Sequence, residues 1–219
     1  MDIDYIEVIK VVATILALLI AIIGHEIMHG LIAYKYGDIT AKQLGRLSIN
    51  PIPHIDIVGS IILPLSLYLL DAPFILGWAK PVPVNINQVI QNGGYLGALN
   101  VSLAGVLYNF ILAIVSSIIL NSFSEPQDLT DVFIYYLFFQ LVIINVVLGV
   151  FNLWIVPKFD GANAFIYISL MLGTRKVADF YSKIENYSLI ILLIIFMIPQ
   201  FQELIFSPAL WIWRELLLN

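Results

Sequence analysis

Residues 11–29 read VVATILALLIAIIGHEIMH, a long apolar run that ends in two histidines and a glutamate. No charged residue stands between Lys10 and Glu26. A helix needs about 20 mostly apolar residues to cross a bilayer, and the segment 5–34 is long enough to do so. Ionisable side chains inside such a helix are costly and usually serve a function. The stretch therefore predicts a membrane-spanning helix with a functional site near one end.

The composition of the whole chain is that of a membrane protein. Of its 219 residues, 61% are hydrophobic and 11% are charged, and the mean hydropathy is +0.97. Soluble domains are about half apolar and about a quarter charged. The net charge of −5 offers no basic surface, so nucleic acid is not expected as a partner. The chain has no cysteine, so a metal site would have to use His, Asp or Glu.

Further spans are predicted where charged residues are absent or sparse, over 94–121, 132–157 and 187–206. Pro199 is expected to kink the last of them. The tail 208–219 holds two tryptophans, a residue type enriched at membrane interfaces, and is expected to form an interfacial segment.

The segment 57–79 is apolar but interrupted by Asp71 and two prolines, so it either crosses the membrane or dips in and returns. Basic residues concentrate in cytoplasmic loops, which favours a hairpin turning near Asp71-Ala72-Pro73. The hairpin places the N-terminus and the acidic loop 122–131 outside. It places eight of the ten basic residues in the cytoplasm, namely Lys35, Lys42, Arg46, Lys80, Lys158, Arg175, Lys176 and Lys183. A full crossing would put the loop 122–131 on the wrong side.

These arguments predict an all-α polytopic membrane protein with four full spans and a re-entrant hairpin. The whole chain, 1–219, is expected to form a single membrane-embedded domain. Re-entrant backbone is tolerated only where protein or water shields it, so a cavity is implied.

The pattern His25-Glu26-x-x-His29 is typical of zinc proteases. Residues four apart share one helix face, so both imidazoles can bind one ion, and Glu26 can take a proton from water at the metal. The alternative interpretation is that the helix ends near His25 and that these side chains only meet the membrane interface.

Asp160 is the predicted third ligand. It follows the charge-free span 132–157, and Pro157 ends or bends that helix while Gly161 permits tight backbone. In the four-span topology, this end lies at the same depth as the two histidines. The alternative is an aspartate in an ordinary helix-terminal turn. Two histidines and a carboxylate suit zinc, but the same set also suits iron.

Together, these motifs resemble the site-2 protease family of intramembrane zinc metalloproteases, in its short prokaryotic subgroup without an appended soluble domain. The resemblance covers about residues 20–165. It rests on the His25–His29 motif with Gly37-Asp38, on NPIPHID at 50–56, on GWAKPVPVN at 77–85 and on NLWIVPKFDG at 152–161. The family's Ala-Gly-Pro-x-x-Asn element reads AGVLYN at 104–109, so its proline is lost but its asparagine remains.

The resemblance implies a metalloendopeptidase that hydrolyses a peptide bond within or near a transmembrane helix of a membrane-protein substrate. The charge placement already predicts a multi-pass protein of the cell membrane whose active site lies toward the cytoplasm. The resemblance also implies that Glu26 is the general base and that one Zn²⁺ ion is bound by His25, His29 and Asp160.

Three further residues are candidate substrate-binding or oxyanion groups. Asn152 could bind the substrate carbonyl or only join helices, and Asn109 has the same two interpretations. His54 could support the site or simply lie in a loop. Asn145 is expected to be structural. The extended stretch Lys80–Pro83 could pair with an unwound substrate strand, or its lysine could anchor at the membrane surface.

Two other classes of function use some of the same residues. A membrane metal carrier would need the ligands but not Glu26, and a catalytically inactive scaffold would need neither. The substitution Glu26→Gln separates all three classes. Neither the oligomeric state nor the identity of the substrate follows from the sequence.

Overall fold

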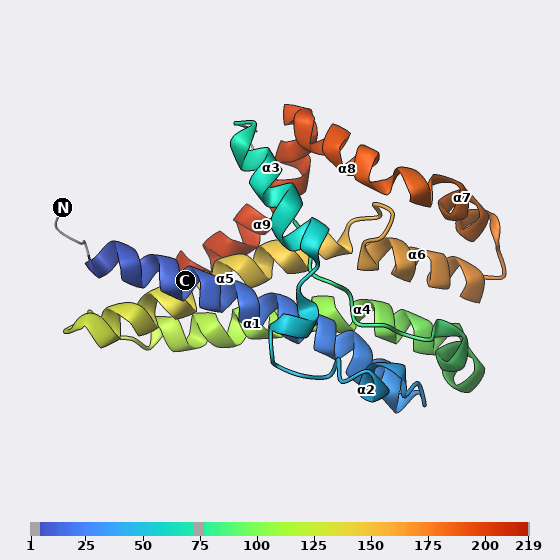
Figure 1. Ribbon diagram of the computed structural model, residues 1–219, viewed down its shortest axis with the longest axis horizontal. Helices are drawn as coiled ribbons and strands as arrows, with labels where there is room; N and C mark the ends of the chain where they lie inside the picture. Colours follow the sequence, from blue (N-terminus) through green and yellow to red (C-terminus); the bar gives the residue numbers. More distant parts are fainter. Residues whose placement is uncertain (1–4, 72–76, 219) are drawn as a thin grey trace.

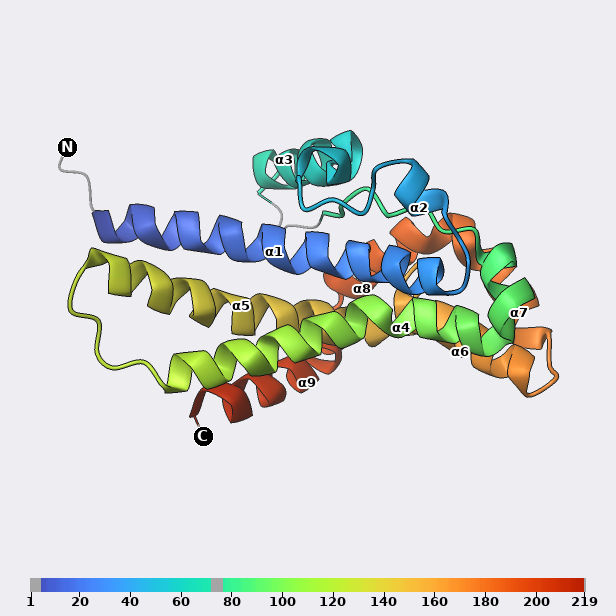
Figure 2. The same ribbon diagram turned by 90° about the horizontal axis from the view of Figure 1, so that it is seen from below.

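The computed structural model describes residues 5–71 and 77–218, apart from the side chains of Pro199 and Leu218. Three long helices pack on one another at its centre (Figures 1 and 2): α1 (Tyr5–Lys35), α4 (Ile86–Asn121) and α5 (Leu129–Leu153). In the described part, these three and the segment Lys176–Met197 are long and apolar enough to cross a membrane. The protein is therefore an all-α polytopic membrane protein, as predicted.

One face of α1 is made of small residues at four-residue spacing. Ala13, Ala17 and Ala21 are fully buried, and His25 continues the same stripe. Residues four apart lie above one another on a helix, and small side chains let membrane helices approach closely. The packing that holds α1 against α4 and α5 therefore also turns His25 into the protein.

The helix α4 bends once within its length, at Gly94, where φ is +63°. Glycine adopts this left-handed conformation without a steric penalty. The predicted span, 94–121, thus begins at the bend, and residues 86–93 form about two separate helical turns before it. No bend occurs at Val106, where the family's proline is lost, because α4 stays helical there.

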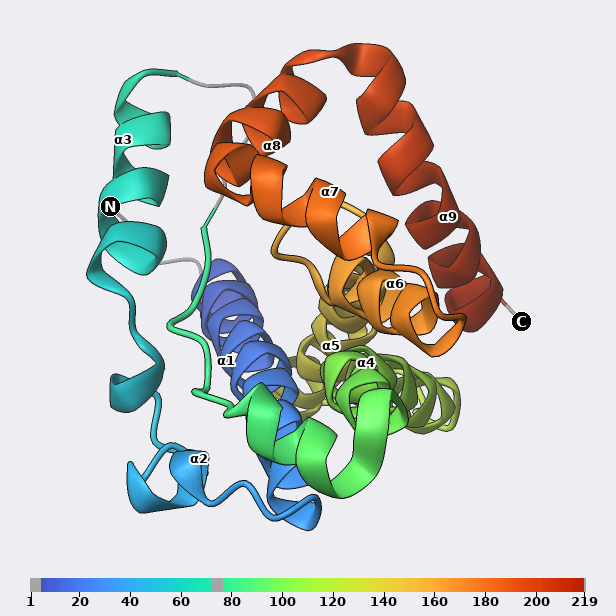
Figure 3. The same ribbon diagram turned by 90° about the vertical axis from the view of Figure 1, so that its right-hand side faces the viewer.

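The segment between α1 and α4 folds as a hairpin beside α1 (Figure 3), as predicted. It holds the short helices α2 (Thr40–Gln43), η1 (Ile52–His54), η2 (Ile57–Ile62) and α3 (Leu63–Leu69). The helix over 57–69 rises roughly 20 Å, which is too short to cross an apolar layer of about 30 Å.

The returning chain of the hairpin bonds to the outgoing chain. The amide of Trp78 donates to the carbonyl of Gly59 at 3.1 Å, and the amide of Lys80 donates to the carbonyl of His54 at 2.9 Å. The close approach requires glycine, because a Cβ on Gly59 would lie 2.3 Å from the indole nitrogen of Trp78. In the predicted turn, Ala72 and Pro73 lie outside the described residues.

The chain after α5 holds α6 (Asp160–Met171), α7 (Lys176–Ile184), η3 (Glu185–Tyr187), α8 (Ser188–Met197) and α9 (Pro199–Leu218). It arches from α6 through α7 and α8, above α1 in Figure 3, to α9 on the side away from α2. The predicted kink at Pro199 is confirmed. However, it divides the predicted span 187–206 between two helices, since proline removes a donor from the helical ladder.

The tail predicted over 208–219 forms the second half of α9, and its interfacial position stays a prediction. This helix runs lengthwise along α5, from a ring contact between Phe206 and Phe151 to the far half of α5. Ala209 is buried with Val142 and Val146 in one apolar cluster. The apolar residues of α9 recur at helical spacing and pack against the bundle, while Leu210 and Trp211 are exposed, so one side of this helix remains free to meet a membrane interface.

Candidate metal centre

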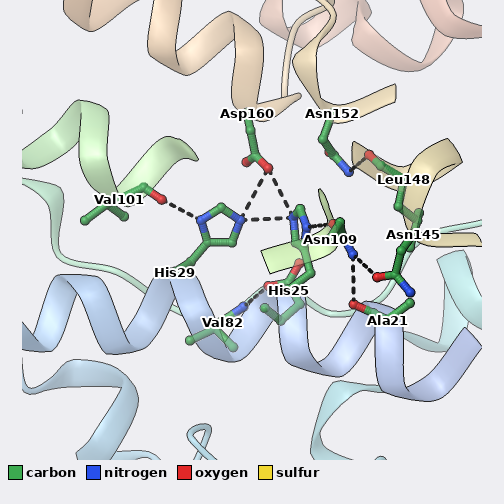
Figure 4. Close-up of polar contacts among 11 residues, drawn as sticks. Ala21, His25, His29, Val82, Val101, Asn109, Asn145, Leu148, Asn152 and Asp160 are labelled. Carbon is green, nitrogen blue, oxygen red and sulfur yellow. Dashed lines mark hydrogen bonds and ion pairs between the residues drawn. The ribbon is translucent and has the colours of Figure 1, made fainter. Parts of the chain in front are cut away.

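The two histidines of α1 face a single point inside the protein (Figure 4). His25 is 7% exposed, and its Nε2 atom lies 3.0 Å from Nε2 of His29. Both rings point away from the surface because they extend the buried alanine stripe of α1.

Asp160, the first residue of α6, completes the cluster. Its Oδ2 atom lies 3.1 Å from Nε2 of His25 and 3.4 Å from Nε2 of His29. Gly161 makes this approach possible, because a Cβ there would lie 2.0 Å from the carbonyl oxygen of Leu153. The structure thus brings together the three residues predicted as metal ligands, and their ligand atoms all lie within 4.8 Å of one another.

The donor and acceptor pattern of this cluster fits a metal ion. Nδ1 of His29 lies 2.7 Å from the carbonyl oxygen of Val101, which can only accept, so this nitrogen donates and the neutral ring offers its Nε2 lone pair. Oδ2 of Asp160 is buried without a hydrogen-bond partner among the described atoms. Tetrahedral zinc ligands at 2.0–2.1 Å stand roughly 3.3 Å apart, and the separations of 3.0–3.4 Å bracket that value.

The charge state of Asp160 also suits a ligand. Burial raises the pKa of this carboxyl, but the adjacent imidazoles of His25 and His29, whose Nε2 atoms lie 3.1 and 3.4 Å from Oδ2, outweigh burial and hold the pKa below its ordinary value of 3.8. The side chain is therefore an ionised carboxylate at neutral pH, which is the form that binds a cation.

Glu26 follows His25 directly and is fixed by the hairpin's returning chain. Its Oε2 atom accepts a hydrogen bond of 2.7 Å from the main-chain amide of Val82. We call residues 80–85 the strap, since they are anchored to α1 and to the loop after it. Arg46 donates to the carbonyl oxygens of Lys80 and Pro81, and Asp38 accepts from the amide of Asn85 at 2.6 Å.

These contacts do not support strand pairing at Lys80–Pro83. The amide of Lys80 donates to the main-chain carbonyl of His54, and the amide of Val82 donates to the carboxylate of Glu26. Pro81 and Pro83 have no N–H. This stretch therefore has no main-chain donor left for an added substrate strand.

The three candidate substrate-binding residues lie in different surroundings. Oδ1 of Asn109 lies 2.6 Å from Nδ1 of His25, so Asn109 contacts a predicted ligand. Its amide nitrogen donates to the carbonyl of Ala21 and to Oδ1 of Asn145, which leaves it no N–H for a substrate. Asn152 lies on the Asp160 side of the site in Figure 4 and donates to the carbonyl of Leu148 at 3.0 Å. His54 donates from Nε2 to the carbonyl of Ser48 and fixes the hairpin instead of touching the three ligands.

Comparison with known proteins identifies the family. A protein of Bacillus subtilis (strain 168) named "Putative zinc metalloprotease YwhC" is 35% identical over 197 residues, with 84% of this chain and 80% of that protein covered. The chain belongs to this zinc metalloprotease family. No protein-family model matches the chain, and no solved structure matches it significantly. For a zinc metalloprotease, the cluster of two imidazoles and a carboxylate is the expected metal centre.

Sequence reasoning about this zinc metalloprotease missed the function of one glycine. A Cβ on Gly105 would lie 2.5 Å from the ring of His25, so only glycine leaves room for this ligand. A glycine inside a long helix is itself a signal of close packing, because it weakens the helix by about 1 kcal/mol relative to alanine. No sequence signal predicts the contact of Val82 with Glu26, because its donor is a main-chain amide, a group that every residue except proline has.

Proposed function

We propose that this zinc metalloprotease is an intramembrane endopeptidase of the site-2 protease type. It hydrolyses a peptide bond within or near a transmembrane helix of a membrane-protein substrate. The observation that carries the proposal is the place of the ligands on α1. The helix α1 is long enough to span a bilayer, and His25 lies ten residues before its end at Lys35. This separation is about 15 Å along the helix axis. A substrate helix can meet the site at that depth.

His25, His29 and Asp160 would hold one zinc ion, and this ion would supply the Lewis acidity that lowers the pKa of water and polarises the scissile carbonyl. Glu26 takes a proton from the attacking water as the water oxygen bonds to the carbonyl carbon. Glu26 then passes this proton to the amide nitrogen as the C–N bond breaks, and it ends the cycle as a carboxylate.

Two other residues assist in this proposal. The amide of Val82 holds one carboxylate oxygen of Glu26, which leaves the other to accept the proton. The side-chain amide of Asn152 donates one N–H to the carbonyl of Leu148. Its second N–H can donate to the oxygen of the scissile carbonyl, which becomes negative during attack.

The proposed setting is the cell membrane, with the site toward the cytoplasm and lipid around the spans. Water enters from the cytoplasmic end of α1. The substrate helix unwinds locally before cleavage, because the carbonyl groups of a helix are already hydrogen-bonded.

The test is cleavage of a transmembrane reporter by the detergent-purified protein and its Glu26→Gln variant. Glutamine keeps an oxygen for Val82 but cannot act as a base, so we expect kcat to fall about 10²- to 10⁴-fold while zinc stays bound. The matched control is Glu7→Gln, at an exposed glutamate of the same helix, which should cleave normally.

Two outcomes would contradict the proposal. Full cleavage by Glu26→Gln would assign the base to another group. Zinc binding without cleavage of any of several transmembrane reporters, together with zinc uptake into vesicles, would favour a metal carrier.

A further inference from the structure

Two asparagines that are fully buried connect α1, α4 and α5 behind His25 (Figure 4). Asn145 of α5 contacts Asn109 of α4, and Asn109 contacts His25 of α1. Both asparagine side chains are 0% exposed, so water cannot replace a missing partner. A buried amide group without a hydrogen-bond partner would cost about 1–3 kcal/mol. Each asparagine side chain therefore adopts the orientation in which its oxygen and its nitrogen both have partners.

The direction of the chain is set at its outer end. The carbonyl oxygen of Leu141 lies 2.8 Å from the amide nitrogen of Asn145. A main-chain carbonyl can only accept a hydrogen bond, so the nitrogen of Asn145 must face it. The side-chain oxygen of Asn145 consequently faces Asn109.

The same logic fixes Asn109. Its Nδ2 atom lies 2.8 Å from Oδ1 of Asn145 and 3.4 Å from the carbonyl oxygen of Ala21. Both neighbours accept, so Nδ2 must face them and the oxygen of Asn109 must face His25. At 2.6 Å from that oxygen, Nδ1 of His25 is the donor. The lone pair of a neutral His25 is therefore on Nε2, which faces His29 and Asp160.

We infer that Asn145 is a positioning residue for the metal centre, acting through Asn109 to hold His25 in the tautomer that binds zinc. We call the contacts from Asn145 through Asn109 to His25 the relay. His29 needs no relay, because the carbonyl of Val101 accepts from its Nδ1 directly. This inference rests on the proposed role of His25 as a zinc ligand. It replaces the expectation that Asn145 only packs helices together.

Removing the amide of Asn145 should release this control. In Asn145→Leu, a side chain of similar size leaves Asn109 held only by the longer contact of 3.4 Å to the carbonyl of Ala21, so its nitrogen can turn toward His25, which favours the opposite tautomer. Groups that orient metal ligands contribute about 10- to 100-fold to affinity. We expect Asn145→Leu to weaken zinc binding about tenfold and Asn109→Leu to weaken it by more.

The matched control is Val146→Ala, which opens a cavity at the next residue of the same helix. Val146 is fully buried and does not belong to the relay, so its truncation should lower thermal stability but leave the zinc affinity unchanged. Zinc affinity is measured by competition with a chromophoric chelator, and stability is measured by thermal unfolding in detergent.

A second measurement uses the wild type alone and does not depend on any variant folding. The chain has three histidines, so ¹⁵N spectra of histidine-labelled protein are simple to assign. In the zinc-free protein with neutral rings, His25 should carry its proton on Nδ1.

The outcomes separate this inference from the proposed function. If the wild type does not bind zinc, the metal centre itself is wrong. If the wild type binds zinc but Asn145→Leu binds it equally tightly, or if neutral His25 carries its proton on Nε2, the relay is overturned and the metal centre stands.

Discussion

The main-chain amide of Val82 donates a hydrogen bond of 2.7 Å to Oε2 of Glu26. This contact joins the strap to the proposed general base, although 56 positions separate the two residues. Because the donor belongs to the main chain, the strap must keep its path for the contact to exist. The first prediction follows from the length of the glutamate side chain.

We predict that Glu26→Asp lowers kcat about 100-fold while zinc affinity stays unchanged. Aspartate keeps the carboxylate but is one methylene shorter, so it cannot reach Val82 and the water together. A misplacement of about 1 Å at a reacting group can cost this much. Steady-state cleavage of a transmembrane reporter measures the effect, with Glu7→Asp as the control. An unchanged kcat would mean that the Val82 contact does not position the base.

The substitution Gly105→Ala is predicted to weaken zinc binding at least tenfold. The added Cβ would lie 2.5 Å from the ring of His25, which must then move from its place. In the control, Gly149→Ala, the Cβ meets the ring of Phe110 at 3.0 Å, a side chain that can shift without touching a ligand. Equal zinc affinities in the two variants, both folded, would contradict the steric argument.

Acid should loosen the strap through Asp38. Burial raises the pKa of this carboxyl, but hydrogen bonds from Thr40 and Asn85 outweigh burial and hold it below the ordinary value of 3.8. A pKa lowered by folding stabilises the folded state above the unfolded value, and this contribution disappears as the pH falls through the folded value.

The unfolding temperature should therefore differ most between the wild type and Asp38→Asn at pH values above about 5. The difference should shrink as the pH falls below about 4. Thermal unfolding in detergent across this range measures it. A difference that stays constant with pH would show that ionisation of Asp38 does not hold the strap.

Chelation of zinc is predicted to lower the unfolding temperature, because the ligands join α1 to α6. A ligand at 100 times its dissociation constant stabilises the folded state by about 2.7 kcal/mol. Asp160→Asn should show little response to the chelator, whereas His54→Gln should respond as the wild type does, since His54 bonds to Ser48 instead. A full chelator response in Asp160→Asn would remove this residue from the metal centre.

The proposed orientation can be tested with single cysteines, because the wild type has none. Gln43 and Ser124 are both exposed and lie in loops predicted on opposite sides of the membrane. A membrane-impermeant thiol reagent added to intact cells should label Ser124→Cys and leave Gln43→Cys unlabelled until the cells are opened. The reverse pattern would place the N-terminus and the metal centre on the other sides.

The sequence allows prediction of the features that depend on local pattern. Hydropathy locates α1, α4 and α5, since a membrane span is defined by its own composition. The hairpin at 57–79 follows from charge placement. The three ligand residues follow from helical spacing and from matching depth, and the structure brings them together, although zinc binding by them stays a prediction.

The remaining features depend on contacts between distant segments. An apolar stripe such as that of α9 can face either a membrane interface or a protein neighbour, so its packing on α5 could not be decided from its residues. Asn109 could face a substrate or a ligand until the position of Asn145 was known. The strap's hold on Glu26 depends on a main-chain amide, which no residue type reveals.

The dependence of the metal centre on Asp160 has a consequence for biosynthesis. His25 and His29 leave the ribosome early, whereas Asp160 follows only after α1, α4 and α5 have been made. A nascent chain therefore inserts its first spans with an incomplete set of ligands. In the proposed centre, the ligand set is complete only when α6 has docked, so we expect neighbouring membrane proteins not to meet an active protease during insertion.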